Sequence, residues 1–309
     1  MALNKRNAHL RDALITFDAE PHKYTCQGEA DYISVTTWNH SHFKPFDADV
    51  IIQQMMSNKR NWLKSPYFGK SKEEIKAEWE LNGVEAARLG TEMHAAIERW
   101  ASPPDPPTWV SNNADLLKYN RGFKSSAKQT ITLPRADLTP DGGVGACLLA
   151  GGVPPHYVDF VNDYPNLKPY RTEWMIFDEE VRLAGSIDMV YEADSNGELL
   201  IYDWKRCKEI KKYNNFGDYA LTECIKHLPD TNFWHYALQL NLYKAILEGK
   251  YGKKIKEMWL VGLHPNALSY QMLEVPDLSE EIAALFIYRK QQLKNNVEYN
   301  TNTNTNVSL

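Results

Sequence analysis

Three apolar segments that follow one another between residues 170 and 205 constrain the fold most strongly. They read YRTEWMIF, LAGSIDMVYEA and ELLIYDWK, and each is rich in β-branched and aromatic residues. The last two are separated by the turn residues Asp194-Ser195-Asn196-Gly197. The sequence therefore predicts adjacent strands, of which the last two form a hairpin.

Helical patterns flank these strands. Ser71 and Glu74 have the spacing of a capping box, and Asn82-Gly83 is predicted to interrupt the helix that they open. Further elements are predicted as a helix over 84–100, a helix over 235–249 that ends at Gly249, strands over 257–263 and 269–275, and a helix over 279–293.

The predicted organisation has three parts. Residues 1–70 form an N-terminal hairpin and helical extension, with the hairpin turn at Gly28 and a helix start at Ser34 and Thr36. Residues 71–295 form the main domain, with a flexible insertion at about 101–156, where periodicity is lowest. The polar tail, 296–309, is predicted to be disordered.

Composition excludes several classes of protein. The 309 residues are 43% hydrophobic and carry a net charge of -5, which argues against a disordered or fibrous chain and gives no global sign of a nucleic-acid partner. No apolar run approaches the roughly 20 residues of a membrane span. Four scattered cysteines indicate free thiols in a reducing, intracellular compartment: cytoplasm or nucleus, with a mitochondrial or viral origin left open.

The predicted hairpin brings together two carboxylates and a lysine. If the turn is centred between Ser195 and Asn196, Asp188 lies opposite Asp203; if Asn196-Gly197 forms a two-residue loop, Asp188 lies opposite Lys205. Both registers keep the three side chains on one face. Facing carboxylates repel one another, and a divalent cation such as Mg²⁺ compensates them. The alternative is a solvent-facing acid pair with Lys205 as a surface partner.

Five short motifs, taken in their order along the chain, indicate a family resemblance. Gly90-Thr91-Glu92-Met93-His94, Glu173, Gly185-Ser186-Ile187-Asp188, Asp203-Trp204-Lys205 and Gln239 to Tyr243 together resemble the RecB-type branch of the PD-(D/E)xK nuclease superfamily. Ser34-Val35-Thr36 resembles the mitochondrial genome-maintenance exonucleases of that branch. The resemblance implies an α/β fold, a restriction-endonuclease-like core with a mixed central β-sheet flanked by helices. It also implies hydrolysis of DNA phosphodiesters with Mg²⁺ or Mn²⁺.

The resemblance also implies roles for single residues. The metal ligands would be His94, Asp188, Asp203 and the main-chain carbonyl of Trp204, and the catalytic residues Asp188, Asp203 and Lys205, with Lys205 orienting the attacking water. Gln239 and Tyr243 would position the substrate, and Glu173 would be a further metal ligand or a supporting acid. Glu98 lies one helical turn after His94 on the same face, where it could orient the imidazole or reach a metal-bound water. Ordinary packing is the alternative for His94, Gln239 and Tyr243, and a structural ion pair for Glu173.

Local basic segments compensate for the acidic total. Residues 205–212 and 250–257 each carry several lysines or arginines against one acid, and we expect them to form a track for phosphates, with Arg206 and Lys208 as DNA-binding residues. Solvated surface is the alternative. Aromatic residues were considered for base stacking or, more simply, core packing: Trp100, Trp174, Trp234 and Tyr236.

The leading hypothesis is a metal-dependent DNA exonuclease for single-stranded or end-bearing DNA. In the family that the sequence resembles, members with an iron–sulfur cluster place three cysteines after the Tyr motif. No cysteine follows Tyr243, so the resemblance implies no cluster here. No P-loop is present, so no helicase motor is expected in the sequence, and the nuclease would act alone or beside a separate helicase or polymerase. The alternatives are a non-catalytic nucleic-acid-binding module on the same fold and an RNA endonuclease.

Overall fold

The computed structural model describes residues 2–102, 154–193, 196–214 and 217–305, with side chains to residue 295. Most of the predicted insertion, 103–153, lies outside the described residues. Within the described ranges, no helix is both long and apolar enough to cross a membrane.

A mixed six-stranded sheet forms the centre of the molecule, and its order is β3-β5-β6-β7-β8, with β4 also paired to β5. The pairs β4–β5, β5–β6 and β7–β8 are antiparallel, whereas β3–β5 and β6–β7 are parallel. The strands are β3 (Ile33–Ser34), β4 (Lys168–Asp178), β5 (Leu183–Glu192), β6 (Leu199–Lys205), β7 (Ile255–Gly262) and β8 (Gln271–Glu274).

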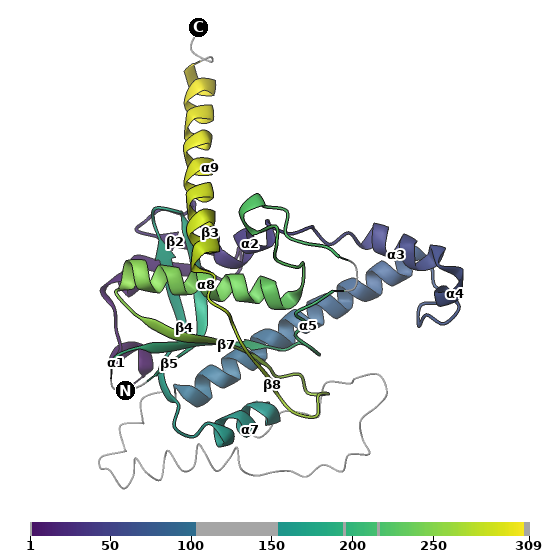
Figure 1. Ribbon diagram of the computed structural model, residues 1–309, viewed down its shortest axis with the longest axis horizontal. Coiled ribbons are helices and arrows are strands. Elements are labelled where there is room, and N and C mark those ends of the chain that lie inside the picture. Colours follow the sequence, from purple (N-terminus) through teal and green to yellow (C-terminus); the bar gives the residue numbers. More distant parts are fainter. Residues whose placement is uncertain (1, 103–153, 194–195, 215–216, 306–309) are drawn as a thin grey trace.

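Helices cover both faces of this sheet (Figure 1). Helix α8 (Asn232–Tyr251) packs on one face, over side chains such as Trp174 and Ile201. Helices α5 (Lys72–Ala101) and α7 (Pro155–Asp163) pack on the other, over the aromatic rings of β6. This arrangement confirms the predicted fold class, a mixed sheet flanked by helices.

The register of the central hairpin matches the first of the two predicted registers. Met189 pairs with Tyr202, and Glu192 with Leu199. Asp188 and Asp203 therefore occupy the next facing positions of the two strands, immediately beyond the last pair. Because β6 is also paired with β7, the strand that carries Asp203 is held on both sides.

The N-terminal residues contribute to this sheet through β3. The hairpin of β1 (Ile15–Asp18) and β2 (Lys23–Cys26) turns between Asp18 and Lys23, so the predicted turn at Gly28 is wrong for this hairpin; Gly28, with φ of +82°, lies in a second turn. As predicted, a helix starts at Ser34, whose hydroxyl accepts a hydrogen bond from the Thr37 amide at the start of α2 (Val35–His40). Two short helices precede β1: α1 (Leu3–Arg6) and η1 (Leu10–Leu14).

Helix α5 is one continuous helix of 30 residues, so the predicted interruption at Asn82-Gly83 is wrong. The predicted capping box is present, because Ser71 and Glu74 exchange hydrogen bonds. A glycine weakens a helix by only about 1 kcal/mol, which the remaining residues of a long helix can offset. The first half of α5 extends away from the sheet together with α3 (Ala48–Ser57) and α4 (Lys59–Trp62) (Figure 1).

Two helices run further than predicted. Helix α8 passes Gly249 and ends at Tyr251, with Gly252 in the left-handed conformation as its cap. Helix α9 (Ser279–Thr305) continues through residues 296–305, which we predicted to be disordered; the rest of that tail lies outside the described residues. Propagation adds a hydrogen bond per residue once a helix exists, so a polar segment can extend it. A short helix, η4 (Glu223–Ile225), precedes α8.

Candidate active site

Three carboxylates lie in a row across three neighbouring strands. On β4, Glu173 lies between Thr172 and Trp174, whose partners on β5 flank Asp188. On β6, Asp203 directly follows the last residue that pairs with β5. Facing side chains on adjacent strands have Cβ atoms about 5 Å apart. The sheet therefore concentrates negative charge at one place, where an isolated set of acids would be unfavourable.

The backbone departs from regular strand geometry at this row. Glu173 has a φ of +43°, in the left-handed region that non-glycine residues rarely adopt. Ile187 packs on the α8 side of the sheet, whereas Met189 packs on the α5 and α7 side. Residues two apart on a regular strand share a face, so the side-chain alternation changes at Asp188. Such irregularities re-aim side chains and are frequent at functional sites.

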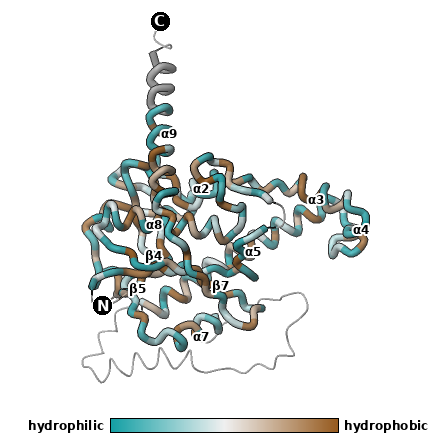
Figure 2. Tube along the Cα trace, viewed as in Figure 1, coloured by the Kyte–Doolittle hydropathy of each residue, from teal (hydrophilic) through white to brown (hydrophobic). Residues whose placement is uncertain are grey.

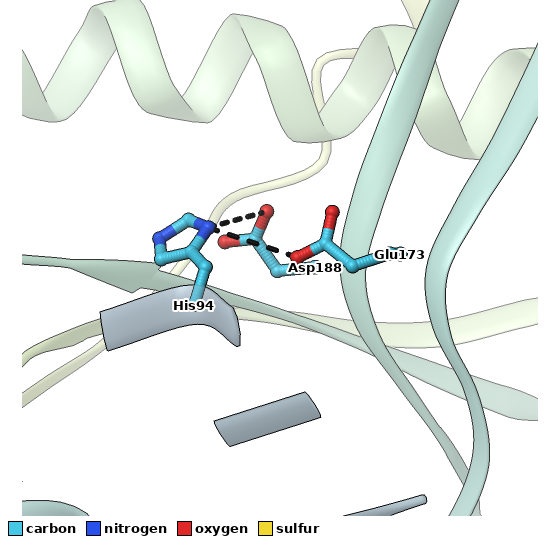
Figure 3. Close-up of side chains that lie close together, drawn as sticks. All are labelled: His94, Glu173 and Asp188. Carbon is cyan, nitrogen blue, oxygen red and sulfur yellow. Dashed lines mark ion pairs between the residues drawn. The ribbon is translucent and has the colours of Figure 1, made fainter. Parts of the chain in front are cut away.

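His94 reaches the carboxylates from α5 (Figure 3). Its Nδ1 lies 3.7 Å from a carboxylate oxygen of Asp188 and 3.8 Å from one of Glu173. Its Nε2 lies 2.8 Å from the carbonyl oxygen of Trp204. A carbonyl can only accept, so Nε2 carries the proton, and in the neutral ring Nδ1 keeps its lone pair toward the acids.

These three residues fit a divalent cation. One atom each from His94, Glu173 and Asp188 lies within 4.8 Å of the other two. An imidazole nitrogen and two carboxylate oxygens form a donor set that suits Mn²⁺ and, less well, Mg²⁺. Asp203, which we predicted as a ligand, is not part of this group. Glu173, predicted as a further metal ligand or a supporting acid, is part of it.

Asp203 and Lys205 form an ion pair instead. The Lys205 Nζ lies 2.8 Å from a carboxylate oxygen of Asp203, which is only 2% exposed. The side-chain amide of Gln239 lies 3.5 Å from the other oxygen of Asp203 and 3.2 Å from the hydroxyl of Tyr243. Asp203 and Lys205 thus lie side by side on one face of β6, as predicted, and Gln239 and Tyr243 of α8 lie next to this pair.

The Trp204 backbone lies between the Asp203–Lys205 pair and the group formed by His94, Glu173 and Asp188. Its amide donates a hydrogen bond of 2.8 Å to Asp188, and its carbonyl accepts from His94. The carbonyl that we predicted as a metal ligand thus contacts another predicted ligand directly. Because the indole of Trp204 is buried between α5 and α7, this peptide is fixed in place.

The pKa values of several ionisable groups in the site are shifted by burial and by the charges of their neighbours. Burial and the neighbouring Asp188 raise the pKa of Glu173 to about 7. Burial also raises the pKa of Asp203 to about 6, against the opposing effect of Lys205. Burial disfavours the charge on Lys205, but Asp203 and Asp188 outweigh it and raise the pKa of the ammonium. For His94, the same two neighbours that flank Nδ1 outweigh burial and raise its pKa.

The remaining predicted residues lie at different distances from this centre. Glu98, half-buried on α5, is near enough to Glu173 for their charges to interact. Arg206 and Lys208 directly follow β6, and both act electrostatically on His264, which follows β7. Within the described chain, these residues form the basic edge next to Lys205.

The second basic segment does not extend that edge. Ile255 pairs with Leu199 at the start of β6, six residues before Lys205, which corresponds to about 20 Å along the strand. Lys250, near the end of α8, is ion-paired with Glu180 in the turn between β4 and β5. The expectation of one track through residues 205–212 and 250–257 is therefore wrong, because the parallel pairing places them at opposite ends of β6.

Two contacts of the site escaped sequence reasoning. Ser186 donates a hydrogen bond of 3.1 Å to Glu173, and it stands within the G-S-I-D motif, where a hydroxyl two residues before an acid is a weak signal. Tyr236 places its ring 4.5 Å from the Lys205 ammonium, one turn of α8 before the Gln239 region. Among the other candidate stacking residues, Trp174 is buried in the core cluster under α8, and Trp234 packs against that cluster. Trp100 packs against the cluster on the other face of the sheet.

Comparison with known proteins agrees with this geometry. No curated protein sequence matches the chain. The sequence model of the PD-(D/E)XK nuclease superfamily matches residues 66–306, which includes every motif residue of the site from Gly90 to Tyr243. Divalent metals serve the nucleases of this superfamily, and the acidic cluster with His94 fits one. The chain belongs to the PD-(D/E)XK nuclease superfamily.

Proposed function

We propose that this chain is a divalent-metal-dependent exonuclease that hydrolyses single-stranded or end-bearing DNA in repair, recombination or replication. The observation that carries the proposal is the geometry of the acid row: His94, Glu173 and Asp188 converge, and the Asp203–Lys205 pair lies beside them. A non-catalytic module has no physical reason to keep buried carboxylates next to a buried lysine.

The metal ligands in this proposal are Nδ1 of His94 and carboxylate oxygens of Glu173 and Asp188. Asp203 and the Trp204 carbonyl adjoin this group and are the further ligands that the family resemblance implies. A bound Mg²⁺ or Mn²⁺ would supply Lewis acidity toward the phosphoryl oxygen and lower the pKa of water. One imidazole among oxygen ligands favours Mn²⁺, so we expect activity with both metals.

Lys205 supplies the positive charge next to the reacting phosphate in this proposal. Its ammonium stays protonated between Asp203 and the ring of Tyr236, so it can hydrogen-bond the attacking water and offset the charge that develops on the phosphate. Asp203 holds Lys205 in place, and Gln239 holds Asp203. We assign Gln239 and Tyr243, together with Arg206 and Lys208, to positioning of the DNA backbone.

Cleavage assays with separate substrates test this proposal. End-labelled single-stranded and double-stranded DNA, circular single-stranded DNA and RNA would each be incubated with Mn²⁺ or Mg²⁺. We expect stepwise loss of linear DNA and survival of circular DNA. The Asp203→Asn and Lys205→Gln variants should lose at least about a hundredfold in rate, because each removes one partner of a buried charge pair at the reaction centre. Asp49→Asn, on the exposed surface of α3, is the matched control.

Other outcomes would identify the alternatives. Cleavage of circular DNA contradicts exonuclease action, and preferential cleavage of RNA indicates an RNA endonuclease. Equal cleavage by wild-type protein and the Asp203→Asn variant refutes the proposed site. Binding of DNA without cleavage under any metal condition indicates a non-catalytic module. Stimulation by an added helicase or polymerase would support the proposed division of labour with a separate motor.

A further inference from the structure

The tip of the projecting arm carries lysine and arginine side chains that form no ion pair with the residues that the structure describes. We define the arm tip as residues 58–70, which include α4 and the turn before α5 and contain no acidic residue. Lys59, Arg60 and Lys64 are exposed, and no ion pair joins them to any described residue. Lys70 is paired with Glu78. The arm tip therefore presents a net positive surface on a chain whose total charge is negative.

Aromatic rings stand between these cations. Phe68 is 54% exposed, and its ring centre lies 6.1 Å from that of Trp62 in an edge-to-face arrangement. Leu63 is 66% exposed. Apolar residues continue along α3 beyond the body of the molecule (Figure 2). Exposed apolar side chains grouped with charges are typical of a binding surface rather than of free solvent-facing structure.

We propose that the arm tip binds single-stranded DNA at a distance from the site of cleavage, an inference that rests on the proposed function. Cations interleaved with exposed aromatic rings are the combination that binds unpaired nucleic acid, since phosphates pair with the cations and bases stack on the rings. Duplex DNA has no free base faces for Phe68 and Trp62. An acidic protein surface would satisfy the cations but would leave the stacking rings unexplained.

The length of α5 sets the size of the DNA that can use both sites. The arm tip ends next to Lys72, and His94 lies 22 residues further along the same helix, a distance of about 33 Å at 1.5 Å per residue. At a stacked spacing of about 3.4 Å per nucleotide, a strand of about ten nucleotides covers this distance. The surface between them carries exposed acids such as Glu73 and Glu80, so contact is expected at the two ends of α5 and not along it.

Binding measurements with matched charge variants test the inference. The variant Lys59→Gln/Arg60→Gln/Lys64→Gln removes the unpaired cations, and Lys23→Gln/Lys168→Gln/Lys294→Gln removes the same charge from exposed positions outside the arm. Fluorescence anisotropy with oligothymidylate of about 30 and about 6 nucleotides, in EDTA, reports affinity. For the long strand, the arm variant should bind about tenfold or more weakly, and its log–log salt slope should fall by about 2.

Further measurements distinguish the contribution of base stacking from that of charge. They also test this inference separately from the proposed function. Phe68→Ala should weaken binding of the long strand without changing the salt slope, since it removes a stacking surface and no charge. Equal losses in the two triple variants, or equal losses for both strand lengths, overturn the arm tip as a DNA site and would leave an acidic protein as the partner to test. Cleavage of the short strand by the wild-type protein with Mn²⁺ tests the proposed function by itself: cleavage supports it and no cleavage contradicts it. The binding measurements in EDTA do not depend on catalysis, so the two proposals can fail separately.

Discussion

Tyr243 lies so close to Gly185 that no side chain fits between them. A Cβ atom at residue 185 would stand 2.7 Å from Cε1 of Tyr243, whose ring is buried and whose hydroxyl contacts Gln239. We expect Gly185→Ala to lower the free energy of unfolding by about 1–3 kcal/mol. It should also slow cleavage, because displacement of Tyr243 moves Gln239 away from Asp203. Urea denaturation and a cleavage assay measure the two effects.

Gly90→Ala is the control for that variant. No heavy atom outside the local helix lies within 4 Å of a Cβ at residue 90, so this change should not lower stability. A loss of stability as large as that of Gly185→Ala would show that the contact with Tyr243 is not the cause.

His42 should make stability depend on pH. Its ring is buried beside Trp38 and contacts the Thr222 hydroxyl, and burial lowers its pKa from 6.5 to about 4. Between these values the unfolded chain binds the proton and the native chain does not. Stability from this group is therefore present above pH 6.5 and is lost as the pH falls toward 4, by about 3 kcal/mol.

Urea titrations between pH 4 and 7 check this expectation. His42→Asn, which keeps a polar group for Thr222, should flatten this part of the pH dependence. His22→Asn, at an exposed turn position, should leave it unchanged. A steep dependence that persists in His42→Asn would assign the effect to other groups.

The residue-level predictions succeeded where they depended on local geometry. The register of the β5–β6 hairpin follows from one short turn, which is readable in the sequence, whereas the change of side-chain alternation at Asp188 is not. Glu173 joins His94 and Asp188 through a left-handed backbone conformation. Glutamate rarely adopts that conformation, so no sequence rule would have predicted it.

At the scale of elements, the continuity of α5 leads to a stability prediction. Gly83 lies inside this helix and a Cβ there meets no atom within 4 Å, so Gly83→Ala should raise the free energy of unfolding by about 1 kcal/mol. Gly28 also has open space around it, but its φ is +82°. Gly28→Ala should therefore cost about 1–2 kcal/mol.

Chemical denaturation of both variants distinguishes backbone conformation from packing. We expect the free energy of unfolding to rise in Gly83→Ala and to fall in Gly28→Ala, because the two glycines differ in φ and not in the space around them. If Gly83→Ala gave no gain, the helix would be interrupted there after all.

Element boundaries were the least predictable feature of the fold. Glycines at 28, 83 and 249 all suggested a turn or an end, yet the first hairpin turns before Gly28, and the two helices pass their glycines. Packing explains the difference for α8: Leu247 and Tyr251, on either side of Gly249, are buried against the sheet, so the helix gains by continuing. Tertiary contacts of this kind are not present in a local sequence window.

At the scale of the whole molecule, a metal at the acid row would connect separate parts of the chain. His94, Glu173 and Asp188 belong to α5, β4 and β5. A ligand that binds only the native state stabilises it by about 2.7 kcal/mol when it is about a hundredfold above its dissociation constant. We expect Mn²⁺ to raise the melting temperature relative to EDTA.

The matched variant for this experiment is His94→Ala. It removes one ligand and should abolish most of the Mn²⁺-dependent rise, whatever its stability in EDTA. A rise of the same size in His94→Ala would place the stabilising metal elsewhere on the chain.

Net charge was a poor guide to partners because charge is distributed unevenly. The acid row, the basic edge after β6 and the arm tip are separate regions, and their sum gives a total of -5. The separation of the two basic segments depends on the parallel pairing of β6 and β7, which connects residues more than fifty positions apart. Such long-range pairing could not be predicted from the local pattern of lysines.

The single helix α5 also has a mechanical consequence. It carries the imidazole of His94 in its second half, anchored to the sheet through Met93, Ala96 and Ile97, while its first half extends away from the sheet beside α3. A rotation of about 10° about this anchor would displace the far end of the helix by about 6 Å. Helix α5 thus has the geometry of a lever that pivots near His94, so a displacement of its far end would move the imidazole relative to Glu173 and Asp188.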